Sequence, residues 1–426
     1  MNPLSDSPPG TRRLLLIFLL TALVLRIFAA VYVGRQVAAQ NAETEKRLPF
    51  LFPDSNNMHS IAMNLAAGKG HVDEKGRYAW RMPGYQAFLA FLYSLGLRSA
   101  GAVRLVQAVL GTANVLLLYF AAKRHFGNRA GLVAAFAGAV DPVFVYFSAL
   151  VLVETLATTM VLLVCLSQRL LQERLGLFRA VLAGAVLGAA VLVKETLSAL
   201  ILFYLLYWFL HGLFWARERN LARGALVLAC LVLGWALVLA PWSLRNHARL
   251  GTYSPFSTTG GHALYESNSD LADGGPNNNR IVFPPGSDAL GEVERDRLLK
   301  REAASWILAH PGRFARLAVR KFLRTWSPVP NYAEARSVPK MAASFLSYTP
   351  VMLLALYALW RLRREWALAW LPVVPVIYTA LLHMVFMGSL RYRVPVMVCL
   401  MILAGKGFDL LLGHGRVERS APVSGS

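Results

Sequence analysis

The chain is poor in cysteine and in acidic residues. Three cysteines, Cys165, Cys230 and Cys399, occur in 426 residues, and all three lie within apolar runs. Their spacing matches neither a disulfide framework nor a metal motif. Asp and Glu number 23 against 44 Lys and Arg, which leaves a formal net charge of +21. No internal repeat or low-complexity segment is visible, and only the tail after Gly413 looks disordered.

Apolar residues are abundant. The chain is 56% hydrophobic and its mean hydropathy is +0.46, which is too apolar for a soluble domain and typical of a polytopic membrane protein. The basic residues gather at the ends of apolar runs. Their expected partners are therefore anionic lipid headgroups rather than nucleic acid.

Ten segments of suitable length and apolarity predict an all-α bundle of about ten transmembrane helices. They cover residues 14–34, 101–121, 129–147, 150–168, 179–193, 196–215, 222–241, 343–361, 366–387 and 393–412. The first apolar run, Leu14 to about Val33, exceeds a signal-peptide core of roughly 7–15 residues. We therefore expect a retained anchor, although Val37-Ala38-Ala39 leaves some room for cleavage.

Charges in the short connections orient the spans. When the spans alternate, one side receives Arg12-Arg13, Lys123, Arg124, Arg129, Arg169, Arg174, Arg179, Arg217, Arg219, Arg223, Arg361, Arg363 and Arg364. By the positive-inside rule this side is the cytoplasm, so both termini are expected there. The outer side then receives two long segments, about 35–100 and 242–342.

This arrangement divides the chain into four parts. We expect an N-terminal transmembrane module at 1–242, including the first outer loop at 35–100, and an outer segment with amphipathic helices at 243–342. C-terminal spans at 343–412 and a cytoplasmic tail at 413–426 follow. The second outer segment is basic on balance, but loops beyond roughly 60 residues count little in the orientation rule.

The first outer segment contains a short predicted helix that begins near Asp54 and stops at Gly68-Lys69-Gly70. Asp54 stands where an N-cap would stand, so plain helix capping is one interpretation. Arg81-Met82-Pro83-Gly84-Tyr85 then precedes the apolar run Phe88–Leu97. About 10 residues are too few to span a membrane, and we expect a helix in the interface.

More polar residues fall on the same outer side. They are Asp141, Glu154, Lys194, Glu195, Arg245, His262 and the Arg391-Tyr392-Arg393 cluster. Ionisable residues near membrane depth are candidates for function. The alternatives are a solvated loop acid for Glu154, snorkelling to headgroups for the cations, and loop hydrogen bonding for His262, Tyr265 and Asn268.

The second outer segment carries a helix predicted at Glu292–Leu308 that is broken at Pro311. A basic amphipathic stretch follows, in which Arg313, Arg316, Arg320, Lys321 and Arg324 alternate with Phe314, Leu317, Phe322 and Leu323. Such a helix suits an anionic membrane surface. Interfacial anchoring is the simpler interpretation, and attraction of a lipid-phosphate substrate is the alternative.

Several motifs, in order and on one side, resemble the GT-C superfamily of membrane glycosyltransferases. They are Asp54 after the first span, Gly68-Lys69-Gly70, Arg81-Met82-Pro83-Gly84-Tyr85, Asp141-Pro142, Val151–Thr155, Pro241–Asn246, Ala309–Phe314 and Arg391–Pro395. The chain most resembles the family-39-like set: protein O-mannosyltransferases, the lipid A aminoarabinose transferase and RgtA/B/C/D-like bacterial glycosyltransferases. It departs from this set at Lys194-Glu195, where relatives often carry Arg-Pro.

The resemblance implies an inverting sugar transfer from a polyprenyl-phosphate donor to an acceptor. The acceptor would be an envelope glycan, a lipid or a protein, reached at the periplasmic face of a bacterial inner membrane. Asp54 is the implied general base, with Glu154 and Asp141 as further catalytic candidates. Arg81, Lys194, Arg245, His262, Arg391, Tyr392 and Arg393 are the substrate-binding candidates, since cations stabilise a leaving phosphate. Two carboxylates and a phosphate could also hold Mg²⁺ or Mn²⁺.

Three other functions stay open at this point. An oligosaccharide ligase would use a lipid-diphosphate donor instead. A lipid or solute transporter would carry charges near the middle of its spans, where this chain has only Arg26, with Pro372 and Pro375 as helix interruptions. A structural partner in an envelope complex would not need the outer cluster of acids and arginines.

Overall fold

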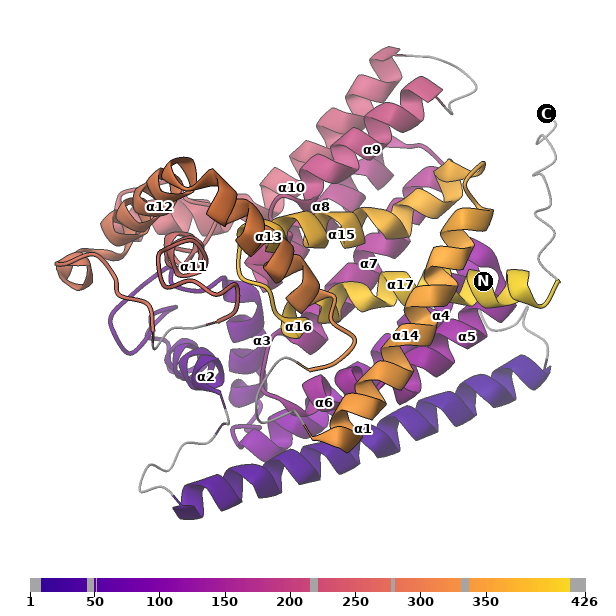
Figure 1. Ribbon diagram of the computed structural model, residues 1–426, viewed down its shortest axis with the longest axis horizontal. Helices are drawn as coiled ribbons and strands as arrows, with labels where there is room; N and C mark the ends of the chain where they lie inside the picture. The colour runs from indigo at the N-terminus through magenta and orange to yellow at the C-terminus, as the bar shows by residue number, and fades with distance from the viewer. Residues whose placement is uncertain are drawn as a thin grey trace.

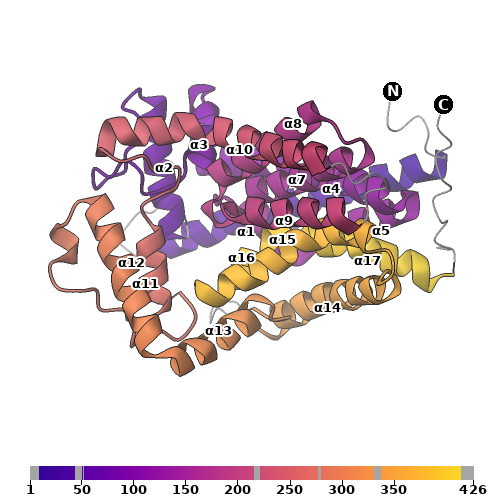
Figure 2. The ribbon, with the colours of Figure 1, turned by 90° about the horizontal axis from the view of Figure 1, so that it is seen from above.

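The computed structural model describes residues 9–43, 50, 52–214, 221–276, 280–330 and 337–413, and these residues form helices and no strands. Figures 1 and 2 show one bundle of long helices with shorter ones gathered at one end. The all-α prediction is therefore confirmed. The predicted tail beyond Gly413 and the basic residues Arg217 and Arg219 lie outside the described residues.

Most of the bundle consists of long apolar helices. They are α1 (Pro9–Glu43), α4 (Ala100–Phe126), α5 (Asn128–Val140), α6 (Pro142–Ala149), α7 (Glu154–Glu173), α8 (Leu177–Val193), α9 (Leu200–Phe214), α10 (Leu221–Leu250), α14 (Val338–Arg361), α15 (Trp366–Val385) and α17 (Met397–Leu411). Short pieces complete them: η1 (Glu195–Leu197), α16 (Leu390–Arg393) and η4 (Val394–Val396).

The two predicted outer segments form the end of the molecule opposite the start of α1 and the end of α17 (Figures 1 and 2). Their helices are α2 (Pro53–Ala66), α3 (Pro83–Ser94), α11 (Gly260–Ser267), η2 (Ser287–Ala289), α12 (Glu292–Ala309) and α13 (Pro311–Thr325). The predicted end of the Asp54 helix at Gly68-Lys69-Gly70 is confirmed, because Gly68 and Gly70 adopt φ of 73° and 84° after α2. The predicted break at Pro311 separates α12 from α13.

Each of the ten predicted spans falls on helix, but the count of ten is not confirmed. Seven helices in the described residues are long and apolar enough to cross a membrane, and an eighth is added if the bent pair of α5 and α6 counts as one. The other two, at Leu177–Val193 and Ala369–Val385, are shorter apolar helices. At about 1.5 Å per residue, α1 is roughly 50 Å long and exceeds a ~30 Å hydrocarbon core.

The span predicted at 129–147 is not one continuous helix. The helix bends by 55° between α5 and α6, where Asp141 and Pro142 interrupt it. Proline lacks the N–H that an uninterrupted helix needs, and it disfavours helical geometry at the preceding residue. The Asp141 carboxylate caps the new helix by accepting from the backbone N–H groups of Val143 and Phe144, both at 2.9 Å.

The last span lies at the centre of the bundle. Within the span Leu390–Leu411, 83% of the most apolar stretch is buried inside the protein, against 22–28% for the peripheral α1, α10 and α14. Close packing also depends on small residues where α8 crosses α10. A Cβ at Gly184 would meet the carbonyl oxygen of Leu231 at 2.0 Å, and one at Gly234 would meet that of Val181 at 2.0 Å. Such small-residue contacts let helix backbones approach within a membrane.

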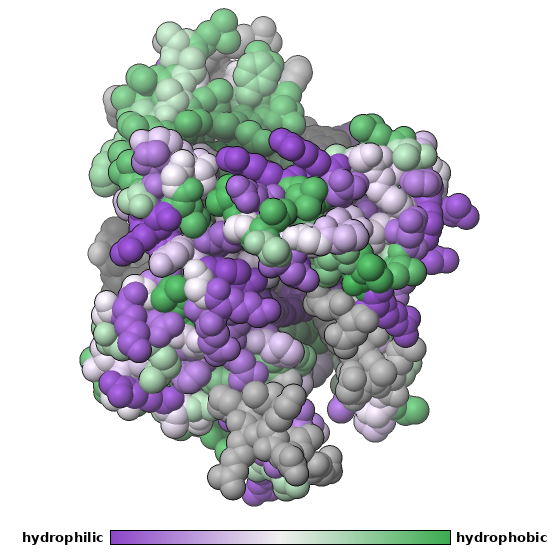
Figure 3. Space-filling view, turned by 90° about the vertical axis from the view of Figure 1, so that its left-hand side faces the viewer, coloured by the Kyte–Doolittle hydropathy of each residue, from purple (hydrophilic) through white to green (hydrophobic). Residues whose placement is uncertain are grey.

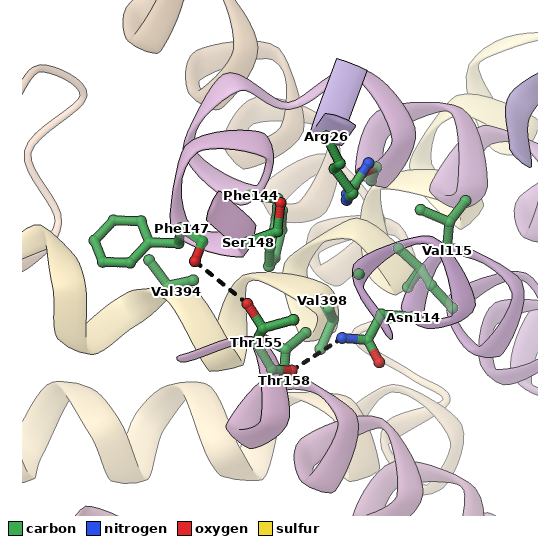
Figure 4. A pocket seen from close by; sticks show the side chains of 13 residues that line it. Arg26, Asn114, Val115, Phe144, Phe147, Ser148, Thr155, Thr158, Val394 and Val398 are labelled. Carbon is green, nitrogen blue, oxygen red and sulfur yellow. Dashed lines mark hydrogen bonds between the residues drawn. The ribbon is translucent and has the colours of Figure 1, made fainter. Parts of the chain in front are cut away.

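Arg26 fixes α1 to the bend between α5 and α6. Its guanidinium donates to the carbonyl oxygens of Gly138 at 2.9 Å and Ala139 at 3.2 Å, which end α5. Figure 4 shows Arg26 beside a small pocket that Asn114 and Thr155 also line. A cation at the C-terminal end of a helix satisfies open carbonyls and the helix dipole. The mid-span charge is thus explained by packing, and the transporter hypothesis loses one of its few supports.

An Arg26→Leu substitution should therefore destabilise the fold. It leaves two buried carbonyl oxygens unpaired, at a cost of about 1–3 kcal/mol each. We expect the thermal unfolding midpoint in detergent to fall by about 5 °C or more. Arg35→Leu, an exposed position on the same helix, is the control and should change the midpoint little. An unchanged midpoint for Arg26→Leu would contradict this role.

Candidate functional site

A cavity of about 1620 Å³ lies where the outer segments meet the outer ends of the bundle. Figure 3 shows this end of the molecule, where hydrophilic residues predominate around a hollow near the centre of the face. Its wall combines α2, the loop before α3, the α8–η1 junction, α11 and α16. Side chains of α1, α6 and α14 line a further part, among them Tyr32, Val143, Tyr146 and Ala343.

Asp54 and Arg81 face each other across the first outer segment. Pro53 begins α2, and Asp54 lies in its first turn, while Phe52 takes the N-cap position without a side-chain cap bond. The capping interpretation of Asp54 is therefore wrong. Its carboxylate instead accepts from Arg81 Nη2 at 2.5 Å and from Arg391 Nη1 at 2.6 Å.

The Arg-Met-Pro-Gly motif places Arg81 on the cavity wall. Met82 precedes α3, and Pro83 is its first residue, where a missing N–H costs nothing. Gly84 lets this helix start against the end of α8, because a Cβ there would meet the carbonyl oxygen of Leu192 at 2.7 Å. The glycine of the motif therefore allows close packing against α8, and the arginine contributes its side chain to the cavity wall.

Glu154 and Lys194 form the inner half of the same cluster. Glu154 is the first residue of α7 and is fully buried, so the interpretation as a solvated loop acid is wrong. Its Oε1 accepts from Lys194 Nζ at 3.0 Å and from Arg391 Nε at 2.6 Å. Arg391 thus bridges the two carboxylates of Asp54 and Glu154 with different nitrogen atoms. The guanidinium of Arg391 therefore binds carboxylates of the protein and does not snorkel to lipid headgroups.

The five charged residues carry a net positive charge. Arg81, Lys194 and Arg391 contribute three positive charges and Asp54 and Glu154 two negative ones. The Coulomb attraction of Arg81 is the largest influence on the pKa of Asp54 and lowers it below the usual range. Partial burial opposes that shift, and Arg391 reinforces it. Asp54 is therefore a carboxylate beside a surplus cation, an arrangement suited to a phosphate.

Two other candidates line the same cavity. Tyr392 stacks on His383 with 4.4 Å between ring centroids, and the Lys194 ammonium lies 5.6 Å from its ring. His262, from α11, stacks on Phe283 with centroids 4.8 Å apart. Both positions agree with substrate contact, which stays a prediction for each.

Three candidates do not line this cavity. Asp141 caps α6, as described above. Arg245 donates to the backbone oxygens of Tyr78 at 2.7 Å and His71, and so fastens α10 to the first outer loop. Arg393 is buried, donates to the backbone oxygen of Ser327 and lies 3.9 Å from the Tyr348 ring centroid. Their geometry is that of structural residues, and we keep no substrate role for them.

Sequence reasoning assigned no role to Glu195, Ser257 or Trp80, although all three line the cavity. For Glu195 the sequence indicated only its side of the membrane and its place in the Lys194-Glu195 departure from the family pattern. The signal that could have found them is the pair of opposite charges at Lys194-Glu195, which interrupts an apolar run between α8 and α9.

The divalent-cation prediction finds no ready-made site in the described part of the chain. No group of three or more His, Cys, Asp and Glu side chains there could hold a metal ion. Asp54 and Glu154 both accept from Arg391. Two carboxylates joined to a guanidinium fit an anion better than a cation.

Comparison with known proteins gives a family match over part of the chain and several solved structures of similar fold. Residues 81–242 match the model of the family described as dolichyl-phosphate-mannose-protein mannosyltransferase. No curated protein matches the chain in sequence.

Three solved structures illustrate the fold. ArnT from Cupriavidus metallidurans, bound to undecaprenyl phosphate, is similar with a TM-score of 0.56 and 17% identity, over 92% of this chain and 60% of that one. The oligosaccharyltransferase of Archaeoglobus fulgidus, tethered with an acceptor peptide, gives 0.57 and 13% over 95% and 50%. AglB from the same organism, with an inhibitory peptide and a dolichol-phosphate, gives 0.56 and 14% over 98% and 52%.

These structures have the fold that the motifs implied, and the resemblance is confirmed at that level. This chain spans only 50–60% of the length of those proteins. At such low identities the likeness concerns the fold, and activity has to be argued from this chain's own site.

Proposed function

Because the chain has the fold of the GT-C membrane glycosyltransferases, we propose that it transfers a hexose or pentose from a polyprenyl phosphate to an acceptor hydroxyl. The reaction would occur at the periplasmic face of a bacterial inner membrane, with both termini in the cytoplasm. The single observation that supports this most is the net-positive cluster at the large outer cavity, in which the Asp54 carboxylate pairs with Arg81 and Arg391.

The donor would bind with its phosphate at the cluster and its prenyl chain among membrane helices. Arg391, Lys194 and Arg81 supply N–H donors for the phosphate oxygens. The apolar part of the cavity between α1, α6 and α14 suits a prenyl chain. Asp54, 34% exposed, is open enough to reach an incoming acceptor, whereas the fully buried Glu154 serves to hold Lys194 and Arg391.

The proposed chemistry uses one base and no acid. The acceptor oxygen attacks the anomeric carbon from the side opposite the phosphate, and its proton passes to the Asp54 carboxylate. The bond between the anomeric carbon and the phosphate oxygen breaks, and its electron pair leaves with the phosphate. The cations stabilise this charge as it develops, so the leaving group needs no proton. Attack from the opposite side inverts the anomeric carbon.

Donor binding should also make Asp54 a better base. In the free protein Arg81 and Arg391 lower the pKa of its carboxylate. A phosphate that takes up N–H donors of Arg391 offsets part of that positive charge, and so raises the proton affinity of Asp54. Deprotonation of the acceptor is thereby favoured only when the donor is in place.

The pH dependence follows from the direction of this shift. A lowered folded-state pKa means that the ion pairs of Asp54 stabilise the fold above the unfolded value of about 3.9, and that this contribution is lost as pH falls through the folded value. Asp54 is thus ionised throughout the pH range of about 5 to 8. We expect kcat/KM to show no acid limb from Asp54 there. An acid limb with a midpoint near pH 6 that moves in an Asp54→Glu variant would contradict this.

The proposal is tested with purified protein in nanodiscs and a panel of undecaprenyl-phosphate sugars that carry a label in the sugar. Crude envelope lipid serves as acceptor, and label in the acceptor is measured together with released undecaprenyl phosphate. Transfer from one monophosphate donor would support the proposal. Transfer only from lipid-diphosphate oligosaccharides, included in the same panel, would identify an oligosaccharide ligase. Transbilayer movement of the lipid without transfer would favour a transporter.

A divalent cation remains a separate proposal. Asp54, Glu154 and the donor phosphate would be its ligands once Arg391 turns from the two carboxylates to the phosphate. The same assay with EDTA, and then with added Mg²⁺ or Mn²⁺, decides whether activity depends on it.

A further inference from the structure

A second polar centre lies on the wall of the outer cavity, around Glu195. The apolar run from α8 into α9 is interrupted at Lys194 and Glu195, and these neighbours turn to different partners. Lys194 pairs with Glu154, whereas Glu195 accepts a short hydrogen bond from the Ser257 hydroxyl. Ser257 in turn contacts the Thr259 hydroxyl at 2.6 Å.

Glu195 accepts from a hydroxyl group, that of Ser257, rather than from a cation. Lys300 is the cation whose charge acts on Glu195, but its ammonium is held by Asp296 at 2.6 Å. A cavity-lining carboxyl group whose side-chain partner is a hydroxyl keeps oxygen lone pairs for further O–H donors. The cations of the charged cluster pair with Asp54 and Glu154 and not with Glu195, so a phosphate and an uncharged hydroxyl-bearing group would bind at different places in the cavity.

Aromatic rings from two segments lie near this centre, because the N–H of Thr258, next to Ser257, donates to the carbonyl oxygen of Ala79, next to Trp80, at 2.8 Å. Trp80 and His262 both line the cavity, and their rings contact edge to face with centroids 5.6 Å apart. Phe283 stacks on His262 from behind, and the Arg77 guanidinium lies 3.5 Å from the Trp80 ring centroid, which fixes both rings in position. Ring faces and edges offer apolar surface to the C–H groups of a ligand.

We propose that Glu195, Ser257 and Trp80 form a binding site for a sugar ring, with Glu195 accepting hydrogen bonds from its hydroxyls. This inference rests on the proposed function, which brings two sugar-bearing substrates into the cavity. The ring could belong to the donor or to a glycan acceptor, and the chemistry of recognition is the same for both. A site built to hydrogen-bond a hydroxyl also discriminates strongly against ligands that lack it.

Binding is tested without turnover, by saturation-transfer NMR on the protein in nanodiscs. The probes are methyl glycosides of mannose, glucose, galactose and arabinose, each with a deoxy analogue. We expect at least one glycoside to bind the native chain, and its affinity to fall by about 10-fold in Glu195→Gln, since the amide keeps only one of the two acceptor oxygens. Ser257→Ala serves as a second variant, and Glu302→Gln, an exposed carboxylate on α12, as the control.

Two results would overturn the site: no glycoside binding by the native chain, or equal binding by Glu195→Gln, Ser257→Ala and the control. If the proposed function is wrong, a different result is expected: the native protein will not bind undecaprenyl phosphate. An Arg391→Leu variant separates the two, because it should lose undecaprenyl phosphate and keep the glycoside. With an active donor, a KM increase in Glu195→Gln for the donor alone or for the acceptor alone identifies whose sugar occupies the site.

Discussion

An Asp54→Asn variant is expected to lose about 10²–10⁴-fold in sugar transfer while it still binds undecaprenyl phosphate. Asparagine keeps the shape of the side chain and can still contact Arg81 and Arg391, but it cannot take up the acceptor's proton. It also removes a negative charge that competes for both arginines. The dissociation constant for undecaprenyl phosphate should therefore stay the same or decrease.

The control for this variant is Asp270→Asn. Asp270 is an exposed carboxylate that also pairs with an arginine, Arg313 at 3.3 Å, but lies outside the cavity wall. Turnover should be unchanged there. If Asp54→Asn still turns over while both variants are folded, Asp54 is not the base. The proposal that the cluster binds phosphate would not be affected by this result.

An Arg391→Leu variant is expected to lose the donor rather than the fold. Removal of Arg391 leaves two neutral pairs, Asp54 with Arg81 and Glu154 with Lys194, so no buried charge is left without a partner. The surplus positive charge disappears. Affinity for undecaprenyl phosphate should fall by about 10–150-fold, the equivalent of hydrogen bonds to a charged group. Turnover should fall by a further factor of about 10²–10³, because the charge developing on the leaving phosphate is stabilised less.

A Glu154→Gln variant, in contrast to Arg391→Leu, is expected to destabilise the fold. It leaves Lys194, only 7% exposed, and Arg391 without one of their carboxylates, so two cations lie close together near the membrane interior. Breaking a buried pair by removing one partner costs about 3–5 kcal/mol. A lower thermal midpoint than that of Arg391→Leu is expected. The reverse order would contradict the charge count on which the cluster is based.

Features set by local sequence could be predicted. Helical spacing and glycines located α2, Pro311 separated α12 from α13, and the long apolar runs located the spans. Alternation of the spans placed Asp54, Glu154 and Arg391 on one common side, and the structure brings these side chains together. These features depend on neighbours within a few residues, which a sequence displays directly.

Roles set by distant contacts could not be predicted. Arg391 and Arg393 are two residues apart, yet one bridges carboxylates from α2 and α7 while the other holds a backbone oxygen after α13. In the sequence Asp141 and Glu154 were both catalytic candidates, but only Glu154 lies in the charged cluster. Alternation of the spans predicted one common side for all four, but side-chain direction depends on packing between segments up to 337 residues apart.

The central claim is that the net-positive cluster binds the donor phosphate and that Asp54 acts afterwards on the acceptor. The most direct test is the equilibrium dissociation constant of undecaprenyl phosphate for the native chain, Asp54→Asn and Arg391→Leu, measured in nanodiscs. We expect Asp54→Asn to bind at least as tightly as the native chain and Arg391→Leu to bind at least about 10-fold more weakly. Equal constants for all three, or no binding by the native chain, would contradict the account.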